Sequence, residues 1–173
     1  MVIRSARTSD LPAIMSVIQC ARSRMRAEGN AVQWEGYPTE HTILDDINAH
    51  TFYVFVGDDA QVHGCFSLSA GPDPDYGDID GAWIDDSPYG VIHRVATDNT
   101  FSHAMAQILD FAHDLGYDHL RIDTNGHNLT MQAVLERLGF VYCGELRRWR
   151  EGPWVAYELS PRTTHLANRA ASA

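Results

Sequence analysis

Residues 89–115, YGVIHRVATDNTFSHAMAQILDFAHDL, place an apolar strand, a short polar turn and an amphipathic helix in direct succession. The first part favours a strand because its side chains are apolar and largely β-branched: Val91, Ile92, Val95 and Ala96. Residues 97–100, TDNT, are typical of turns and can cap a following helix. Apolar residues then recur at helical spacing as far as Gly116: Phe101, Met105, Ile108, Leu109, Ala112 and Leu115.

A strand that runs directly into a helix has a characteristic electrostatic feature. The unpaired N–H groups of the first helical turn, and the positive end of the helix dipole, point at one spot beside the end of the strand. Such a spot suits an anion, and a pyrophosphate above all. An ordinary βα unit without a ligand has the same pattern, so this stretch alone leaves both interpretations open.

The rest of the chain supplies the other parts of a mixed α/β (α+β) sheet domain. Hydrophobic periodicity predicts the order β-α-α-β-β-β-α-β-α-β-β, with helices on both faces of the sheet. The predicted strands are residues 2–6, 51–56, 61–68, 91–97, 119–124, 140–146 and 154–159, and the predicted helices begin near residues 8, 39, 101 and 128. Residues 57–60, GDDA, predict a hairpin turn between the second and third strands. At 173 residues and 45% hydrophobic content, the chain suits a single domain over residues 1–160 and a frayed tail at 161–173.

Two irregular segments separate these elements. Residues 30–38, NAVQWEGYP, carry three side chains able to wall a substrate pocket, namely Gln33, Trp34 and Tyr37, although a loop packed over the core explains them too. Residues 71–88 contain three prolines and six aspartates and predict an acidic surface loop with a short strand at 81–83. On the second helix, Asp45 and Asp46 are expected to face solvent.

Composition and charge argue against several classes of protein. The formal net charge of −10 and the lack of any basic run argue against nucleic-acid or anionic-membrane partners and favour cationic ones. No apolar run is long enough to cross a bilayer and the first residues have no signal-peptide pattern, so we expect a cytoplasmic protein. Cys20, Cys65 and Cys143 lack metal-ligand spacing and predict buried free thiols, and no metal site is assigned.

Two motifs carry a family resemblance: the strand HRVA at 93–96, which enters a helix, and NLTMQAVLERLGFVYCGE at 128–145. An Asn that opens a helix, followed by LGF and then a strand, is typical of the second half of the GNAT superfamily of acyl-CoA-dependent N-acyltransferases. The chain resembles this superfamily over about its first 160 residues.

The resemblance implies an acetyl-CoA site along this strand and helix. The strand backbone at Val95, Ala96 and Thr97 would pair with the pantetheine arm, and the helix from Thr100 would hold the pyrophosphate on its N-terminus. Asn128 would cap its own helix and hydrogen-bond the pantetheine amide. The superfamily's pyrophosphate loop reads Arg/Gln-x-x-Gly-x-Gly/Ala, and the matching positions here are Phe101, Ser102, His103, Ala104, Met105 and Ala106.

Three residues depart from the family pattern. Phe101 replaces a charged or amide side chain, and Ala104 stands where a glycine lets the backbone approach the phosphates. Leu135 stands where many relatives carry a tyrosine that protonates the leaving thiolate, so a general acid would lie elsewhere. These departures leave an alternative open: a catalytically degraded GNAT-fold binding or regulatory module.

The resemblance also singles out His93, which matches the position of a carboxylate that takes the amine's proton in relatives. An imidazole, with an unperturbed pKa of about 6.5, can serve as a base at neutral pH, and a merely structural strand histidine is the alternative. Arg94 should face the side of the strand opposite His93, and we expect it to form a structural ion pair with Asp123 or Glu145. Cys143 allows a ping-pong thiol, although packing explains it better.

Together these features predict the transfer of an acetyl group from acetyl-CoA to a primary amine. His93 would accept the proton during direct transfer, while backbone N–H groups near Val95 steady the oxyanion. The acceptor would be a small-molecule amine or a peptide, and the acidic charge and the aromatic residues of segment 30–38 favour a cationic one. Neither nucleic acid nor membrane is expected as a partner, and a homodimer remains open.

Overall fold

Helices and strands follow one another in the order that hydrophobic periodicity predicts, with one additional strand, β4. The structure is a computed structural model that describes residues 1–147 and 152–162, so residues 163–173 of the expected tail lie outside the described residues. The contacts group the chain into two units, Met1–Ser69 with Ile92–Gln107, and Ala70–Val91 with the residues from Ile108 onward. Within the described ranges, no helix has the length and apolar character needed to span a membrane.

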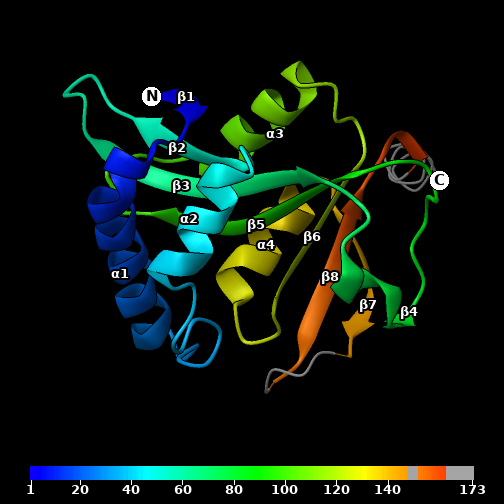
Figure 1. Cartoon of the computed structure of the whole chain (residues 1–173). Coiled ribbons are helices and arrows are strands. Elements are labelled where there is room, and N and C mark those ends of the chain that lie inside the picture. Colours follow the sequence, from blue (N-terminus) through cyan, green and yellow to red (C-terminus); the bar gives the residue numbers. More distant parts are fainter. Residues whose placement is uncertain (148–151, 163–173) are drawn as a thin grey trace. The chain divides into compact units, whose positions relative to one another are not determined.

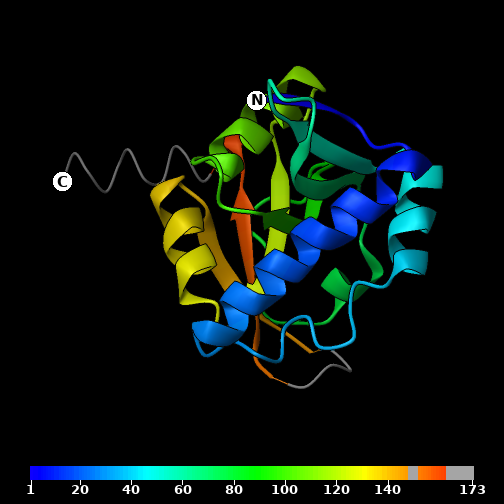
Figure 2. The same cartoon turned by 90° about the vertical axis from the view of Figure 1, so that its left-hand side faces the viewer.

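In the first unit, two helices lie against a group of strands (Figures 1 and 2). The helices are α1 (Leu11–Ala27) and α2 (Glu40–Asn48). The strands, in their order in the sheet, are β1 (Val2–Ser5), β2 (Phe52–Val56), β3 (Val62–Ala70) and β5 (Gly90–Thr97). β2 pairs antiparallel with both β1 and β3, and the Gly57 N–H donates to the Gln61 carbonyl at 3.0 Å, which confirms the predicted hairpin turn.

Side chains fix the starts of both helices in this unit. The Asp10 carboxylate accepts a hydrogen bond from the Arg7 N–H at 2.8 Å, which closes a 3-10 turn over Thr8–Asp10, and α1 follows directly. The same carboxylate accepts two hydrogen bonds from the Arg4 guanidinium, at 2.7 and 3.0 Å. The Thr39 hydroxyl accepts a hydrogen bond from the Thr42 N–H at 3.2 Å and caps α2. Local sequence is therefore enough to start these two helices.

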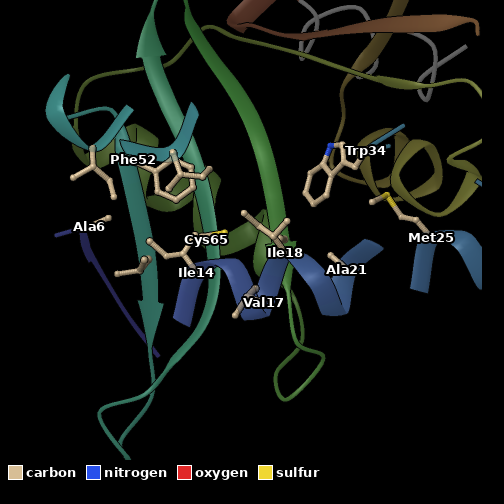
Figure 3. Close-up of a cluster of buried hydrophobic side chains, with 13 residues drawn as sticks. Ala6, Ile14, Val17, Ile18, Ala21, Met25, Trp34, Phe52 and Cys65 are labelled. Carbon is tan, nitrogen blue, oxygen red and sulfur yellow. The ribbon is translucent and has the colours of Figure 1, made fainter. Parts of the chain in front are cut away.

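The apolar face of α1 forms the core of the first unit together with β2 and β3 (Figure 3). Burying this face against the strands is what stabilises the helix, since propensity alone holds an isolated helix weakly. Trp34 is 8% exposed and belongs to the same core. Trp34 therefore packs over the core, as the packed-loop alternative expects. The core side chains of the two strands and α1 are Phe52, Val54, Cys65, Ile14, Val17, Ile18, Ala21 and Met25.

The second unit contains an antiparallel group of strands, the part of α3 (Ala104–Asp114) from Ile108 onward, and α4 (Leu129–Arg137), which contacts β7. The strands, in their order in the sheet, are β6 (Leu120–Asn125), β8 (Trp154–Leu159), β7 (Val141–Leu146) and β4 (Ile79–Gly81). Segment 71–88 contains more regular structure than the predicted surface loop, namely a 3-10 turn and β4. The expected strand at 81–83 is displaced, because β4 covers residues 79–81 and shares only Gly81 with it. Tyr76 from this segment is 3% exposed and packs in the core of the unit.

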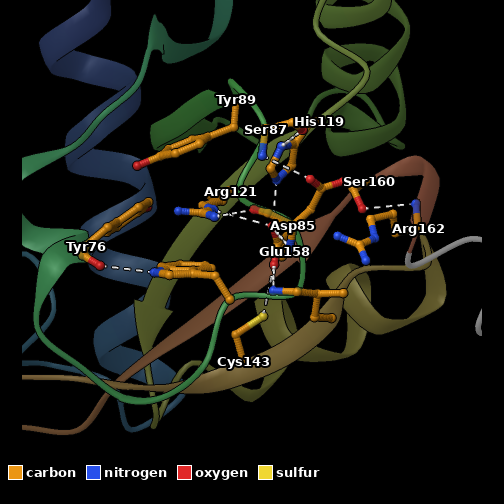
Figure 4. A network of polar contacts seen from close by, with 12 residues as sticks. Tyr76, Asp85, Ser87, Tyr89, His119, Arg121, Cys143, Glu158, Ser160 and Arg162 are labelled. Carbon is orange, nitrogen blue, oxygen red and sulfur yellow. Dashed lines mark hydrogen bonds and ion pairs between the residues drawn. The ribbon is translucent and has the colours of Figure 1, made fainter.

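A fully buried carboxylate, Glu158 on β8, holds segment 71–88 (Figure 4). Its oxygens accept hydrogen bonds from the Ile84 N–H at 2.6 Å and the Asp85 N–H at 3.3 Å. The His119 Nε2 lies 2.5 Å and the Arg121 Nε 3.4 Å from the same carboxylate. A buried carboxylate is tolerated only when it is paired in this way.

The side chain of Arg121, on β6, is buried in the second unit. It is 5% exposed, and its guanidinium lies between the rings of Trp83 and Tyr89, at 4.1 and 3.9 Å from their centres. Its Nη2 donates to the Asp85 carbonyl at 2.6 Å. Strand alternation does not reveal this arrangement, because the acceptors and rings come from distant parts of the chain.

The cysteines agree with the sequence prediction in part. Cys65 and Cys143 are buried and free, whereas Cys20 is exposed, so the prediction of burial is wrong for Cys20. Burial raises the pKa of Cys65 to about 12, and burial with the nearby Glu158 charge raises the pKa of Cys143 to about 12. Both buried thiols are therefore protonated at neutral pH and are poor nucleophiles.

Replacing Glu158 tests the role of this buried network. We expect Glu158→Ala to lower the free energy of unfolding by about 3–5 kcal/mol, because Arg121 and His119 stay buried without their acceptor. Chemical denaturation measures the loss. Glu145→Ala, which removes an exposed carboxylate from β7, is the control. If Glu158→Ala costs no more than this control, the network does not hold the second unit.

Candidate functional site

Strand β5 departs from regular geometry at its centre. Arg94 has a φ of 56°, in the left-handed region that residues other than glycine seldom occupy. His93 precedes this residue and Val95 follows it, and all three side chains are half-buried. The backbone is therefore irregular at the position where the sequence places both a base and an oxyanion contact.

The Arg94 side chain explains how this conformation is held. Its Nη1 lies 2.8 Å from Asp46 Oδ2 on α2, and the two side chains are only 17% and 19% exposed. The guanidinium carbon lies 5.4 Å from the centre of the Tyr37 ring. Asp46 Oδ2 and Arg94 Nε each lack a well-aligned hydrogen bond, so the contact is an ion pair rather than a bidentate pair.

These contacts correct two sequence predictions. Arg94 does form a structural ion pair, but its partner is Asp46 and neither Asp123 nor Glu145. Asp46 is not simply solvated, whereas Asp45 is exposed as expected. The sequence could not indicate this pairing because it depends on which face of α2 lies against β5.

Asp46 interacts electrostatically with His93 as well as with Arg94. Burial raises the pKa of Asp46, and the opposing charges of Arg94 and His93 only partly offset that effect. His93 is therefore an electrostatic neighbour of a half-buried carboxylate. Such neighbours are common around catalytic bases, although structural ion pairs produce the same effect.

The turn after β5 corrects the predicted start of the next helix. Asp98 Oδ1 accepts hydrogen bonds from the Thr100 N–H at 3.0 Å and the Thr100 hydroxyl at 2.7 Å, and Asn99 is left-handed with a φ of 69°. The helix α3 (Ala104–Asp114) consequently begins at Ala104, and not at Thr100. His103, with a φ of 62°, precedes it and accepts a hydrogen bond from the Gln107 N–H at 3.1 Å.

The start of α3 has the donors that an anion needs. None of the N–H groups of Ala104, Met105 and Ala106 donates a hydrogen bond to another residue in the described part of the chain. Such N–H groups, together with the helix dipole, attract a phosphate. In a glycine-rich loop a glycine adopts the left-handed conformation freely, whereas in this chain His103 has that conformation.

Phe101 lies in the same turn but contacts an apolar neighbour. Its ring packs against Phe55 of β2, with ring centres 5.0 Å apart. The exposed side chains of Ser102 and His103 follow it. The residue that stands in place of the usual charged or amide anchor therefore serves the packing of the first unit.

A histidine from β3 holds the turn from one side. His63 Nδ1 lies 2.8 Å from Asp98 Oδ2, and its Nε2 lies 3.1 Å from the Asp59 carboxylate. Hydrogen bonds with Asp98 and then Asp59 raise the pKa of His63. Burial alone would raise the pKa of Asp98, but hydrogen bonds from Thr100 and His63 lower it overall.

The candidate substrate residues of segment 30–38 have partners within the protein. Gln33 is buried and its Oε1 accepts a hydrogen bond from Asn30 Nδ2 at 2.7 Å. Trp34 packs in the core, and the Tyr37 ring contacts the Arg94 guanidinium. Tyr37 is thus the member of this set that lies next to β5, and the binding role of all three residues stays a prediction.

The remaining candidate residue, Asn128, belongs to the second unit. Its side chain accepts a hydrogen bond from the Met131 N–H at 3.1 Å and caps α4, as the sequence predicts. Leu135 is buried on the same helix and offers no proton donor. The first unit contains the other predicted site residues: His93, Val95, Ala96, Thr97, Phe101, Ser102, His103, Ala104, Met105 and Ala106.

Comparison with known proteins gives a family match and several structural matches. The sequence matches the model of the family described as Acetyltransferase (GNAT) family over residues 17–140. No curated protein matches the sequence. The structure is similar to a GNAT-family acetyltransferase from Streptococcus agalactiae 2603, with 28% identity and a TM-score of 0.80 over 92% of this chain and 94% of that chain. This similarity confirms the mixed α/β fold.

Two further matches are structures of complexes. N-acetylglutamate synthase from Neisseria gonorrhoeae, complexed with coenzyme A and N-acetylglutamate, is 18% identical with a TM-score of 0.57, over 91% of this chain and 35% of that chain. Rv2747 from Mycobacterium tuberculosis, in complex with CoA and NLQ, is 22% identical with a TM-score of 0.53, over 84% of this chain and 74% of that chain.

The cluster of His63, Asp59 and Asp98 should make the stability of the fold depend on pH. The raised pKa of His63 means that its contribution is complete below the unfolded value of about 6.5 and is lost as the pH rises through the folded value. The lowered pKa values of Asp59 and Asp98 mean that their contribution is present above about 4 and is lost as the pH falls through the folded values. The cluster therefore stabilises the fold most between pH about 4 and about 6.5.

Urea denaturation of the wild type and His63→Gln across this range measures that contribution. We expect the difference in the free energy of unfolding to be largest near pH 5–6, roughly midway in this window, and to shrink as the pH rises through the raised pKa of His63. His113→Gln, which removes an exposed histidine that pairs with Asp118, is the control. A difference that stays constant from acidic to alkaline pH would contradict the role given to His63.

Proposed function

Because the chain belongs to the GNAT acetyltransferase family, we propose that it moves an acetyl group from acetyl-CoA to a primary amine by direct transfer. The observation that carries this proposal is the arrangement along residues 93–106. An irregular strand with a half-buried histidine leads into a fixed turn, and the turn leads into a helix whose first N–H groups are unpaired. In the proposed function, these parts would supply a base, a binding edge and an anion site in one continuous stretch.

Acetyl-CoA is proposed as the co-substrate. The backbone of Val95, Ala96 and Thr97 would hydrogen-bond the pantetheine arm, and the N–H groups at the start of α3 would hold the pyrophosphate. The role of Asn128 toward the pantetheine amide, which the family resemblance implies, stays a prediction. Two structures of similar fold contain coenzyme A, which supports the choice of co-substrate.

His93 is proposed as the general base. The amine nitrogen would attack the thioester carbonyl while a ring nitrogen of His93 accepts the amine's proton, directly or through water. Backbone N–H groups beside the left-handed Arg94, at Val95, would steady the oxyanion. Collapse of the resulting tetrahedral intermediate would break its carbon–sulfur bond and release coenzyme A as a thiolate.

Direct transfer is favoured over a ping-pong route by the state of the buried cysteines. A ping-pong route needs a thiolate that accepts the acetyl group first. The pKa values of Cys65 and Cys143 are both raised to about 12, so fewer than about 1 in 10⁴ of these thiols ionise at neutral pH. Neither is therefore a competent acyl carrier.

The acceptor is proposed to be a small amine or the N-terminus of a peptide. The net charge of −10 and the half-buried carboxylate of Asp46 favour a cationic amine. Arg94 already occupies one contact of Tyr37 and partly neutralises Asp46, which argues against a highly charged polyamine. N-acetylglutamate in a complex of similar fold makes amino acids a class worth testing first.

Acetyl-CoA titration and an acceptor screen test this function. We expect acetyl-CoA to bind in calorimetry, and coenzyme A to be released when an acceptor amine is added. Amino acids, polyamines, aminoglycosides and peptides form the acceptor panel. If acetyl-CoA at about millimolar concentration does not bind, the enzyme function is wrong, and the binding or regulatory module becomes the better explanation.

Replacing His93 tests its role as base. We expect His93→Gln to lower kcat at least about tenfold and to leave the Kd of acetyl-CoA unchanged, because the role of the ring is confined to proton transfer. The acidic limb of the pH profile of kcat/KM should also disappear. His41→Gln, on the exposed face of α2, is the control. A His93→Gln protein with a wild-type pH profile would remove the assignment.

A further inference from the structure

At the start of α3, the position that carries a cation or amide in the family pattern holds an apolar residue. Phe101 stands where the family pattern has such a side chain, and it packs on Phe55 instead. We propose that Arg24, on α1, supplies the missing charge by binding a phosphate group of acetyl-CoA. This inference rests on the proposed function, because it concerns the same co-substrate.

The contacts of Arg24 hold its guanidinium at the turn after β5. Its Nη1 donates to Asn99 Oδ1 at 2.6 Å and reaches the Thr97 carbonyl at 3.4 Å. Thr97 ends β5, and Asn99 lies in the turn that leads to Ala104. A side chain from the first helix is thereby fixed on the connection that carries the proposed phosphate site.

The remaining donors of Arg24 are available to a ligand. Within the described residues, the Nε and Nη2 atoms of Arg24 make no hydrogen bond. Neither atom is among the buried polar atoms that lack a partner. These two nitrogens form one edge of the planar guanidinium, which matches two oxygens of a phosphate in a bidentate contact. Because Nη1 is already held, less side-chain freedom is lost when the ligand binds.

Among the residues that the structure describes, no carboxylate pairs with Arg24. Its two acceptors are an amide oxygen and a carbonyl oxygen, whereas Arg94 faces a carboxylate. Asp98, the acidic residue of this turn, is engaged by His63 and Thr100. In a chain with a net charge of −10, Arg24 is thus a fixed cation that has no carboxylate partner within residues 1–147 and 152–162, and it lies beside N–H groups that suit an anion.

Calorimetry with coenzyme A, dephospho-coenzyme A and pantetheine tests this assignment. We expect Arg24→Gln to weaken coenzyme A binding at least about tenfold and to leave pantetheine binding unchanged, because pantetheine has no phosphate. Equal weakening for dephospho-coenzyme A assigns the contact to the pyrophosphate, and weakening for coenzyme A alone assigns it to the 3′-phosphate. Arg26→Gln, on the exposed last turn of α1, should bind all three as the wild type does.

A second variant tests the mechanism without removing the arginine. Asn99→Asp gives Arg24 a carboxylate partner that competes with the phosphate, so we expect it to weaken coenzyme A binding while Tm stays near the wild-type value. A higher salt concentration screens charges more strongly, so it should reduce the difference in coenzyme A affinity between the wild type and Arg24→Gln.

The failure of this inference is distinct from a failure of the proposed function. If the wild type binds coenzyme A and Arg24→Gln binds it equally well, Arg24 does not contact a phosphate, and the function stands. If Arg24→Gln changes only the KM of the acceptor, the guanidinium recognises a carboxylate of that acceptor, and the inference is overturned. If the wild type binds no coenzyme A, the function itself is wrong.

Discussion

The ion pair between Arg94 and Asp46 determines the geometry on which the candidate site depends. A left-handed conformation costs a residue other than glycine about 1–2 kcal/mol, so it persists only where surrounding contacts hold it. Here α2 supplies the carboxylate and segment 30–38 supplies the Tyr37 ring. Because His93 and Val95 flank Arg94, the same contacts fix the backbone on both sides of the proposed reaction centre.

The turn after β5 is held in a similar way, by side chains from other elements. His63 on β3 binds the Asp98 side chain, and Arg24 on α1 binds Asn99. The turn itself contributes left-handed residues and an aromatic ring that packs inward. A loop without the usual glycines is therefore given a fixed shape from outside, which is how preorganised binding loops lower the entropy lost on binding.

The second unit uses a different device, a buried polar network in place of further apolar packing. Glu158 binds two backbone N–H groups of segment 71–88 and faces His119 and Arg121. Apolar packing of similar volume can be as stabilising, but hydrogen bonds to backbone donors specify one arrangement of the segment. The order of this proline-rich and aspartate-rich segment follows from a residue far away in the chain.

The sequence by itself determined the element order, the hairpin turn, the caps at Thr39 and Asn128 and the family motifs, because these signals are local. It also singled out the strand–turn–helix stretch and His93, whose chemical role remains a prediction. Only the tertiary structure decided that α3 begins at Ala104, that Arg94 pairs with Asp46, and that Arg121 is buried. The physical reason is that each of these outcomes depends on charges and rings brought together from distant segments, which periodicity along one segment does not contain.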